Sequence, residues 1–267
     1  MSAGIFERVV CRCTDVHDPV VIVAAHPDDE VIGMGARLKR LRNATVVYVT
    51  DGVPKDIRYS FSAGYPSREA YSRARVKEGS EALALADFTE DDLVRLRFTD
   101  QEVSFFLVGL TLQLCQIFKK IKPVAVFTHP YEGGHPDHDS VSFAVSSAKK
   151  ILKRESPPVY EFTSYHGFWG QIETGEFLPQ NRKQRRYSLN SEDFRLKSSM
   201  LACFESQIAM LKNFSCGHED FRRSPSYNYS APPHKGVLFY EMFDWNMTGR
   251  KWRALAEDAR RLLGIRK

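Results

Sequence analysis

Two kinds of segment alternate through the first 165 residues, and this alternation limits the folds open to the chain. Short apolar, β-branched runs predict buried strands at residues 20–25, 45–50, 93–98, 124–128 and 159–164. Longer segments with helical periodicity separate them, at residues 31–42, 67–86, 101–121 and 139–154. Strands joined through helices pair in parallel and are covered by those helices. We therefore predict an α/β fold, with a Rossmann-like, mostly parallel sheet and helices on both faces.

The chain after residue 166 departs from this alternation. It predicts, in chain order, a polar excursion, a helix, an ordered loop or lid, a strand and a closing helix, at residues 171–187, 191–211, 214–234, 236–243 and 252–263. No sequence linker divides the chain. We therefore predict one domain over residues 1–267, with a catalytic core at about 18–166 and a C-terminal elaboration at about 167–267.

Composition and charge restrict the class of protein. Of the 267 residues, 43% are hydrophobic and 27% are charged, as is ordinary for a globular protein. The net charge of +5 is modest and no basic stripe alternates with aromatic residues, so we expect no nucleic-acid partner. The most apolar stretch, residues 103–118, is too short and too polar for stable membrane insertion. The odd count of five cysteines and the lack of a long apolar run at the N-terminus favour a cytoplasmic protein. A homo-oligomer stays among the open alternatives.

Ionisable residues crowd the end of the first predicted strand, where His26, Asp28, Asp29 and Glu30 precede a predicted helix. In open parallel sheets, ligands bind beyond the carboxyl ends of the strands. These side chains would repel one another and lose hydration without a cation, so the pattern favours a metal held by His26 and Asp29. The alternative is an acidic helix start, in which the carboxylates face the helix dipole.

A second cluster follows the predicted strand at residues 124–128, where His135, Asp137 and His138 open another helix. The spacing of the two histidines offers a further metal ligand and a second imidazole for catalysis. Two imidazoles and one carboxylate, with one position left for water, are the usual ligands of catalytic zinc. Iron(II) accepts the same ligand types, so Zn²⁺ is the predicted cofactor and Fe²⁺ is the alternative.

These two motifs, in this order and spacing, resemble the LmbE/PIG-L family of zinc-dependent de-N-acetylases. Weaker similarity continues through Asp51 and Arg75, and the resemblance covers about the first 165 residues. It implies an enzyme, a metal-dependent hydrolase that removes an N-acetyl group from an N-acetylated amino sugar or its conjugate. The alternatives are another metal-dependent hydrolase, such as a phosphoesterase, and a non-catalytic sugar-binding protein on the same scaffold.

The resemblance also implies roles for individual residues. His26, Asp29 and His138 would be the metal ligands, and Asp28 would be the general base for the attacking water. His135 would stabilise the oxyanion or act as a general acid, and Asp137 would orient a histidine.

Other residues are expected at the substrate or beside the ligands. Arg75 matches a family arginine that contacts substrate hydroxyls, and Glu30 and Asp51 are expected near the site. Several family members carry a tyrosine at the position of Gly133, and Tyr131 is the candidate to replace it.

Each of the remaining candidate residues has a structural alternative to its functional assignment. His129 is expected to support a ligand rather than to bind metal. The aromatic residues from Tyr165 to Trp169, together with Tyr227, Tyr229 and Trp245, are candidates either for stacking on a sugar ring or for packing in the core.

Overall fold

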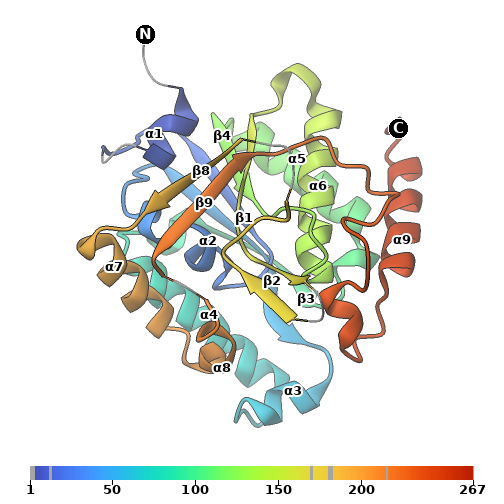
Figure 1. Cartoon of the computed structure of the whole chain (residues 1–267), viewed down its shortest axis with the longest axis horizontal. Coiled ribbons are helices and arrows are strands. Elements are labelled where there is room, and N and C mark those ends of the chain that lie inside the picture. The colour runs from blue at the N-terminus through green and yellow to red at the C-terminus, as the bar shows by residue number, and fades with distance from the viewer. Residues whose placement is uncertain (1–3, 12–13, 169–170, 180–182, 215, 267) are drawn as a thin grey trace.

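The computed structural model describes residues 4–11, 14–168, 171–179, 183–214 and 216–266. Its main sheet has seven strands in the order β3-β2-β1-β4-β5-β9-β8, and a separate two-stranded sheet pairs β6 with β7 (Figure 1). The strands are β1 (Val20–Ala24), β2 (Ala44–Pro54), β3 (Leu93–Asp100), β4 (Ala125–Thr128), β5 (Val159–Phe162), β6 (Tyr165–Phe168), β7 (Gln171–Thr174), β8 (Gln184–Ser188) and β9 (His218–Arg223).

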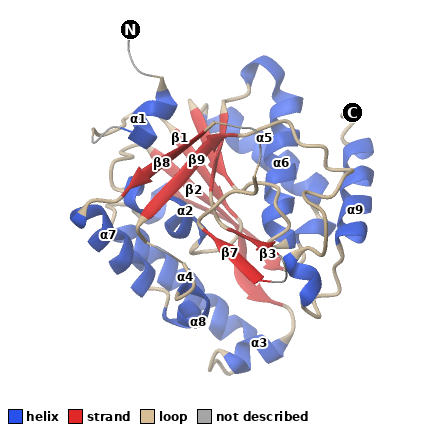
Figure 2. Cartoon of the chain, viewed as in Figure 1, coloured by secondary structure: helices blue, strands red, loops and turns tan. Residues whose placement is uncertain are grey.

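Helices lie on both sides of this sheet (Figure 2). The α-helices are α1 (Ile5–Cys11), α2 (Asp29–Leu38), α3 (Ile57–Ser62), α4 (Arg68–Ala84), α5 (Leu107–Ile121), α6 (Pro136–Leu152), α7 (Ser191–Ala202), α8 (Ile208–Leu211) and α9 (Gly249–Leu262). Short 3₁₀ helices also occur, and those used below are η1 (Glu90–Asp92), η2 (Val103–Phe105), η4 (Glu205–Gln207) and η5 (Phe239–Met242).

The five strands predicted from the first part of the chain pair in parallel, which confirms the α/β prediction. β1 lies between β2 and β4, so the order in which successive strands are added to the sheet reverses next to β1. The last two strands in this order differ, because β9 pairs antiparallel with β5 and β8 pairs antiparallel with β9. The sheet is therefore mostly parallel, with an antiparallel extension supplied by the C-terminal elaboration.

The hydrophobic core forms two layers because successive strand residues point to opposite faces of the sheet. In β1, Val20 and Ile22 enter a cluster with residues of α1, α2, α4 and α7. Val21 and Val23 enter a second cluster with residues of α5 and α6. All five residues of β1 are buried, as expected for a strand covered on both faces.

A third cluster forms where the C-terminal elaboration covers α5 and α6. Trp252 of α9 is fully buried there, and its indole N–H donates to Ser140 Oγ at 3.0 Å and to the Pro136 carbonyl at 3.2 Å. Figure 1 shows α9, in red, along the side of the molecule next to α6. The last helix thus packs directly onto the helix that carries the second motif.

The structure corrects four predictions for the C-terminal elaboration. The predicted strand at residues 236–243 is wrong, because this segment holds the 3₁₀ helix η5 and loops. The polar excursion at residues 171–187 contains β7 and most of β8, and the predicted loop at residues 214–234 contains β9. The helix predicted at residues 191–211 divides into α7, η4 and α8.

β9 escaped prediction because its buried positions are charged. The buried carboxylate of Glu219 accepts from Lys197 Nζ at 3.0 Å. The buried guanidinium of Arg222 donates to Glu161 Oε2 at 2.7 Å. Partners from distant parts of the chain satisfy these charges, so the strand shows no alternation of apolar and polar residues.

Among the described residues, no helix combines the length and the apolar character that a membrane crossing requires. The described cysteines, Cys11, Cys115, Cys203 and Cys216, are all free, and Cys13 lies outside the described residues.

Candidate active site

The two sequence motifs meet at the carboxyl ends of β1 and β4, which are neighbours in the sheet. His26 and Asp29 follow β1, and His135 and His138 follow β4. Because the chain connections diverge between these two strands, this edge of the sheet opens into a crevice. The position matches the expectation drawn from the strand ends alone.

Asp28 occupies a strained backbone conformation, with a φ of 133°, at the start of α2. Non-glycine residues rarely adopt this region, and such strain persists only where the surroundings enforce it. Two contacts hold the turn: Arg75 donates to the Pro27 carbonyl at 2.6 Å, and the Asp28 N–H donates to Glu30 Oε2 at 3.3 Å. The turn directs the Asp28 carboxylate toward Arg75, which also donates to it at 3.0 Å.

Two of the three predicted ligands, His26 and His138, contact the third, Asp29. Asp29 Oδ2 is 3.2 Å from His26 Nδ1, and Asp29 Oδ1 is 3.1 Å from His138 Nε2. His26 and His138 also approach each other, with 5.3 Å between ring centroids. All three side chains are buried.

The buried Nε2 of His138 provides a test of whether these residues suit a metal ion. Within the described part of the chain it has no hydrogen-bond partner, although Asp29 Oδ1 lies 3.1 Å away. The other ring nitrogen, Nδ1, lies 3.4 Å from the hydroxyl of Ser164. A buried nitrogen that faces a carboxylate oxygen without a hydrogen bond is typical of a ligand pair. The donor set therefore fits a divalent cation.

Donor atoms gather in more than one combination. At this site, three sets of described residues have their candidate ligand atoms within 4.8 Å of one another: His26, His135 and His138; Asp29, His129 and His138; and His26, Asp100, His135 and Asp137. The predicted triad of His26, Asp29 and His138 is not one of these sets, and its members are joined by the contacts of Asp29 with the two histidines.

Asp137 supports the site through its backbone partners. Its Oδ2 accepts from the Gln101 N–H at 2.7 Å, and its Oδ1 accepts from the Val103 N–H at 3.1 Å. Oδ2 also lies 3.4 Å from His26 Nε2. This fully buried carboxylate thus joins the end of β3 to the beginning of α6, as expected for a residue that orients a histidine.

His135 has a defined tautomer. Its Nδ1 accepts a hydrogen bond from the Asp137 N–H at 3.1 Å, so the proton of the neutral ring sits on Nε2. Burial, together with the adjacent imidazole of His26, holds the pKa of His135 well below its usual range. The neutral ring therefore presents an N–H donor to the pocket.

The electrostatics of the site follow from burial and from close opposite charges. Burial raises the pKa of Asp28 to about 6, and the guanidinium of Arg75 limits this rise. Burial also raises the pKa of Asp29, but His138 and His129 outweigh it and hold that pKa well below its usual range. The two adjacent carboxylates thus differ strongly in basicity.

A pocket of about 300 Å³, toward the small end of the range for ligand sites, is lined by His26, Asp28, Asp29, His135 and His138. Arg75 lies in its wall, as the resemblance implied. Tyr165 and Trp245 also line it, and their rings contact His138 and His135 with centroids 5.1 and 4.8 Å apart. Two of the aromatic candidates thus lie at the site, whereas Tyr227 and Tyr229 pack against the third cluster. Trp169 lies outside the described residues.

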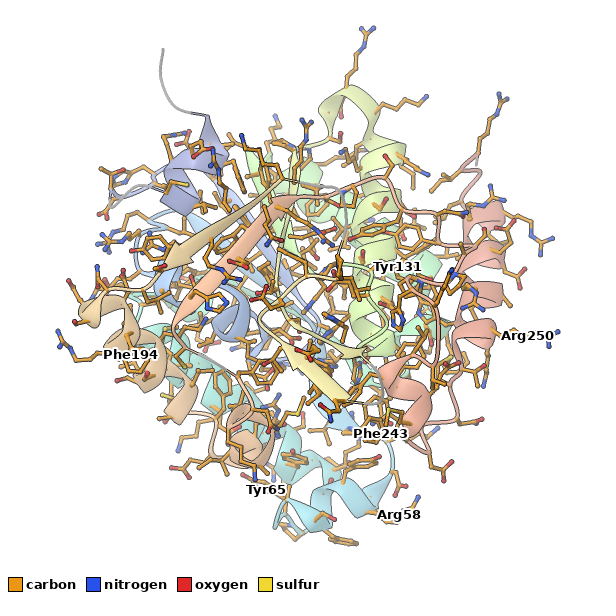
Figure 3. The ribbon with its side chains drawn as sticks, in the orientation of Figure 1. Arg58, Tyr65, Tyr131, Phe194, Phe243 and Arg250 are labelled. Atoms are coloured by element: carbon orange, nitrogen blue, oxygen red, sulfur yellow. The ribbon has the colours of Figure 1, made fainter. Side chains whose placement is uncertain are left out.

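Three residues expected near the substrate lie elsewhere. Glu30 is fully buried and accepts from the Tyr48 hydroxyl at 2.5 Å, so it supports the Asp28 turn. Asp51 accepts from Arg68 at 2.9 Å and is not part of the pocket wall. Tyr131 is buried against Trp252 and donates to the Ala231 carbonyl at 2.9 Å. In Figure 3 it lies well away from Phe243, whose ring stacks on Trp245.

His129 lies next to two of the predicted metal ligands, His138 and Asp29. The Ala25 N–H donates to its Nε2 at 3.1 Å, and its ring stacks on His138 with centroids 4.0 Å apart. Nε2 also lies 3.3 Å from Asp29, and His129 belongs to one of the candidate ligand sets, so its expected role as a structural or supporting histidine stays a prediction.

Sequence reasoning missed Asp100, the last residue of β3. Its Oδ1 lies 3.0 Å from His26 Nε2 and 3.5 Å from His135 Nε2, and the residue lines the pocket. The available signal was its place at the end of a parallel strand, next to β2 in the sheet.

The fold and the cluster together define a Rossmann-like protein with a candidate metal-binding site at the point where the sheet connections diverge. Comparison with known proteins makes the class more specific. The family model described as GlcNAc-PI de-N-acetylase, PIG-L, matches residues 21–149, which is just under half of the chain. The chain therefore contains a PIG-L (LmbE) family domain, and both motifs lie inside it.

Similar proteins include one from Bacillus cereus whose name is Probable N-acetyl-alpha-D-glucosaminyl L-malate deacetylase 2. The two sequences are 28% identical over 144 residues, which cover 52% of this chain and 64% of the relative. The match thus spans just under two thirds of that protein.

Solved structures with a similar fold include a teicoplanin biosynthesis deacetylase, with a TM-score of 0.60 and 18% identity over 78% of this chain and 100% of the other. The teicoplanin deacetylase has also been solved in a zinc-inhibited form, with a TM-score of 0.59 and 17% identity over 78% of this chain and 100% of the other. N,N'-diacetylchitobiose deacetylase from Pyrococcus horikoshii has a TM-score of 0.55 and 22% identity over 82% of this chain and 88% of the other. At these identities the similarity establishes the fold.

Proposed function

We propose that this protein is a metal-dependent hydrolase that removes the N-acetyl group of an amino-sugar conjugate and releases acetate and a free amine. The observation that carries this proposal is the contact of both His26 and His138 with the buried Asp29, beside the more basic Asp28. Among the described residues, Nε2 of His138 has no hydrogen-bond partner there. The PIG-L family domain and the deacetylase names of the similar proteins support the same reaction class.

Two imidazoles and one carboxylate favour Zn²⁺, with Fe²⁺ as the alternative. When bound, such an ion would polarise the amide carbonyl and make water a nucleophile near neutral pH. Zinc lowers the pKa of its bound water to about 7. The zinc-inhibited form of the teicoplanin deacetylase is a reason to measure activity across metal concentrations.

Asp28 is suited to the role of general base. Its carboxylate lines the pocket, and the strained turn and Arg75 fix its orientation. A base with a pKa of about 6 is largely ionised at pH 7 and still basic enough to accept a proton. It takes the proton of the attacking water and can return it to the departing amine.

His135 is suited to stabilising the oxyanion. Because Nδ1 accepts from the Asp137 N–H, Nε2 carries the proton and donates into the pocket. A fixed donor of this kind contributes about a hundredfold to a thousandfold in rate. The same tautomer disfavours the general-acid role, which requires the protonated ring.

One observation favours the phosphoesterase alternative. It is the donor set of His26, Asp100, His135 and Asp137, which could hold a further metal ion. Phosphoesterases commonly use two metal ions. However, both carboxylate oxygens of Asp137 already accept backbone N–H groups, and so does Nδ1 of His135. We therefore expect one metal ion per chain.

The test measures acetate release and metal content on the same samples, with N-acetylated mono- and disaccharides as substrates. We compare wild type with Asp28→Asn, and the matched control is Asp91→Asn, an exposed aspartate on η1. The proposal expects Asp28→Asn to keep one metal ion and lose activity at least a hundredfold, with the control unchanged. Two metal ions and release of phosphate from phosphate esters would favour the alternative. Sugar binding without any acetate release would favour a non-catalytic protein.

A further inference from the structure

A second cavity of about 340 Å³ adjoins the catalytic pocket. The two share four lining residues, Tyr59, Asp100, Gln101 and Trp245. The second cavity extends away from the metal ligands toward Lys55 and Asp244. Asp100 and Gln101 line both spaces, so a ligand bound in the catalytic pocket can extend directly into the second cavity.

A hydrogen bond between two distant segments marks the boundary of the two spaces. Trp245 Nε1 donates to the Tyr59 hydroxyl at 2.8 Å. Tyr59 belongs to α3, which follows β2, whereas Trp245 follows η5 in the C-terminal elaboration. Figure 3 shows Arg58 and Phe243, the neighbours of this pair, at the same lower end of the molecule. The C-terminal elaboration thus supplies a wall that lies outside the residues matched by the family model.

The wall of the second cavity combines aromatic rings with hydrogen-bonding groups. Tyr59, Phe105 and Trp245 supply the rings, and Gln101 and Asn246 supply amides. Trp245 also stacks on Phe243 with centroids 4.7 Å apart, which limits its movement. Flat apolar faces next to polar groups suit a ring that carries several hydroxyls.

The charge of this wall is acidic. Among the described lining residues, four carboxylates, those of Asp56, Asp100, Glu102 and Asp244, accompany one ammonium group, that of Lys55. Arg58, outside the wall, pairs with Asp56, and Lys55 lies 3.9 Å from Glu102. Asp100 also lies 3.0 Å from His26 Nε2, so with these contacts counted the carboxylate of Asp244 is in excess. A carboxylate or phosphate of the ligand next to Asp244 would therefore meet repulsion.

We propose that the second cavity is a subsite for a neutral or cationic ring, such as a second amino-sugar residue, joined to the acylated sugar. This inference rests on the proposed function, and it narrows the substrate to a conjugate of at least two rings without an anionic second group. It also separates this chain from its Bacillus relative, whose name specifies an L-malate conjugate.

The experiment compares kcat/KM for acetate release from three N-acetylglucosamine compounds by the metal-loaded protein. The methyl glycoside has one ring. N,N'-diacetylchitobiose has a neutral second ring, and the L-malate conjugate has an anionic second group. The variants are Trp245→Ala and Asp244→Lys. The control is Phe194→Ala, an exposed aromatic residue on α7 that lies far from Phe243 in Figure 3.

The subsite predicts that wild type prefers the disaccharide to both other compounds at least tenfold. Trp245→Ala should reduce the preference over the methyl glycoside to less than threefold, chiefly by raising KM for the disaccharide. Asp244→Lys should shift the ratio of malate conjugate to disaccharide at least tenfold toward the malate conjugate. The control should keep the wild-type ratios.

Two results would overturn the subsite. One is equal kcat/KM for the methyl glycoside and the disaccharide in wild type. The other is a uniform loss on all three compounds in Trp245→Ala, which would mean that Trp245 only supports His135. If no compound released acetate, the proposed function would fail, and calorimetric binding of N,N'-diacetylchitobiose to metal-loaded wild type and Trp245→Ala would still decide on the subsite. Equal binding by the two proteins would count against it.

Discussion

Gly134 precedes the catalytic candidate His135, and its lack of a side chain is a packing requirement. A Cβ atom at this position would lie 2.0 Å from the carbonyl oxygen of Tyr165 and 2.9 Å from the carbonyl carbon. Both atoms belong to the backbone at the start of β6, so no side-chain rotation can relieve the clash. The Gly134→Ala substitution must therefore move either β6 or the loop that carries His135.

The size of the effect follows from that distance. Ordinary van der Waals contact of a Cβ begins near 3.4 Å, so the two backbones must separate by about 1.4 Å. Forcing one extra methyl group into a packed region costs about 1–3 kcal/mol. At about 3 °C per kcal/mol for a chain of this size, Tm falls by about 3–9 °C. A displacement of about 1 Å at His135 or Tyr165 lowers kcat/KM by about a hundredfold.

The assay pairs thermal unfolding with acetate release for wild type, Gly134→Ala and the matched control Gly109→Ala. Gly109 lies in α5, and a Cβ there would have no neighbour within 4 Å. The control adds the same methyl group and should raise stability by about 0.5–1 kcal/mol, because alanine favours a helix. If Gly134→Ala matched wild type in Tm and kept kcat/KM within twofold, the clash argument would be refuted.

Three further predictions concern stability. Trp252→Ala removes a fully buried indole that donates to Ser140, so we expect the free energy of unfolding, measured with urea, to fall by about 3–5 kcal/mol. Trp252→Phe should lower it by less. Burial raises the pKa of Glu132 to about 7, with Arg222 opposing the rise, whereas the ordinary value is 4.5. The folded protein then holds a proton that the unfolded chain has lost, so stability falls as pH rises from about 4.5 to 7, by about 3 kcal/mol at 1.36 kcal/mol per pH unit. Glu132→Gln should flatten this fall in unfolding measured between pH 4.5 and 8, and an unchanged slope would contradict the assignment. Removal of metal with a chelator should lower Tm, and Zn²⁺ at a hundred times its Kd should restore about 2.7 kcal/mol in wild type but not in Asp29→Ala.

The parallel core was predictable because its strands are covered on both faces and need no paired charges. Their sequences are therefore continuous apolar runs, which are the strongest local signal for a buried strand. β9 gives no such signal, because Glu219 and Arg222 are buried in it with partners from α7 and β5. A pattern based on hydrophobic residues cannot identify a strand whose buried side chains are satisfied by distant charges.

The candidate site was also predictable from the sequence only in part. Residues that follow β1 and β4 were found because each motif is contiguous in sequence and because parallel strands end at one edge. Asp100 comes from β3 and has no motif around it, so only the folded sheet brings it within 3.0 Å of His26. Glu30 and Tyr131 stand beside motif residues in sequence, yet their side chains point to Tyr48 and Trp252. Proximity along the chain does not decide the direction of a side chain.

The sequence by itself determined the order of the elements in the parallel core, the edge of the sheet that carries the two motifs, and the ionisable residue types at that edge. These properties depend on local periodicity and on short motifs, which the chain carries before it folds. Only the tertiary structure decided the antiparallel extension, the tautomer of His135 and the contact between Trp245 and Tyr59. Each of these depends on partners that are brought together by packing, since groups far apart in sequence satisfy one another's charges and hydrogen bonds only once the core has formed.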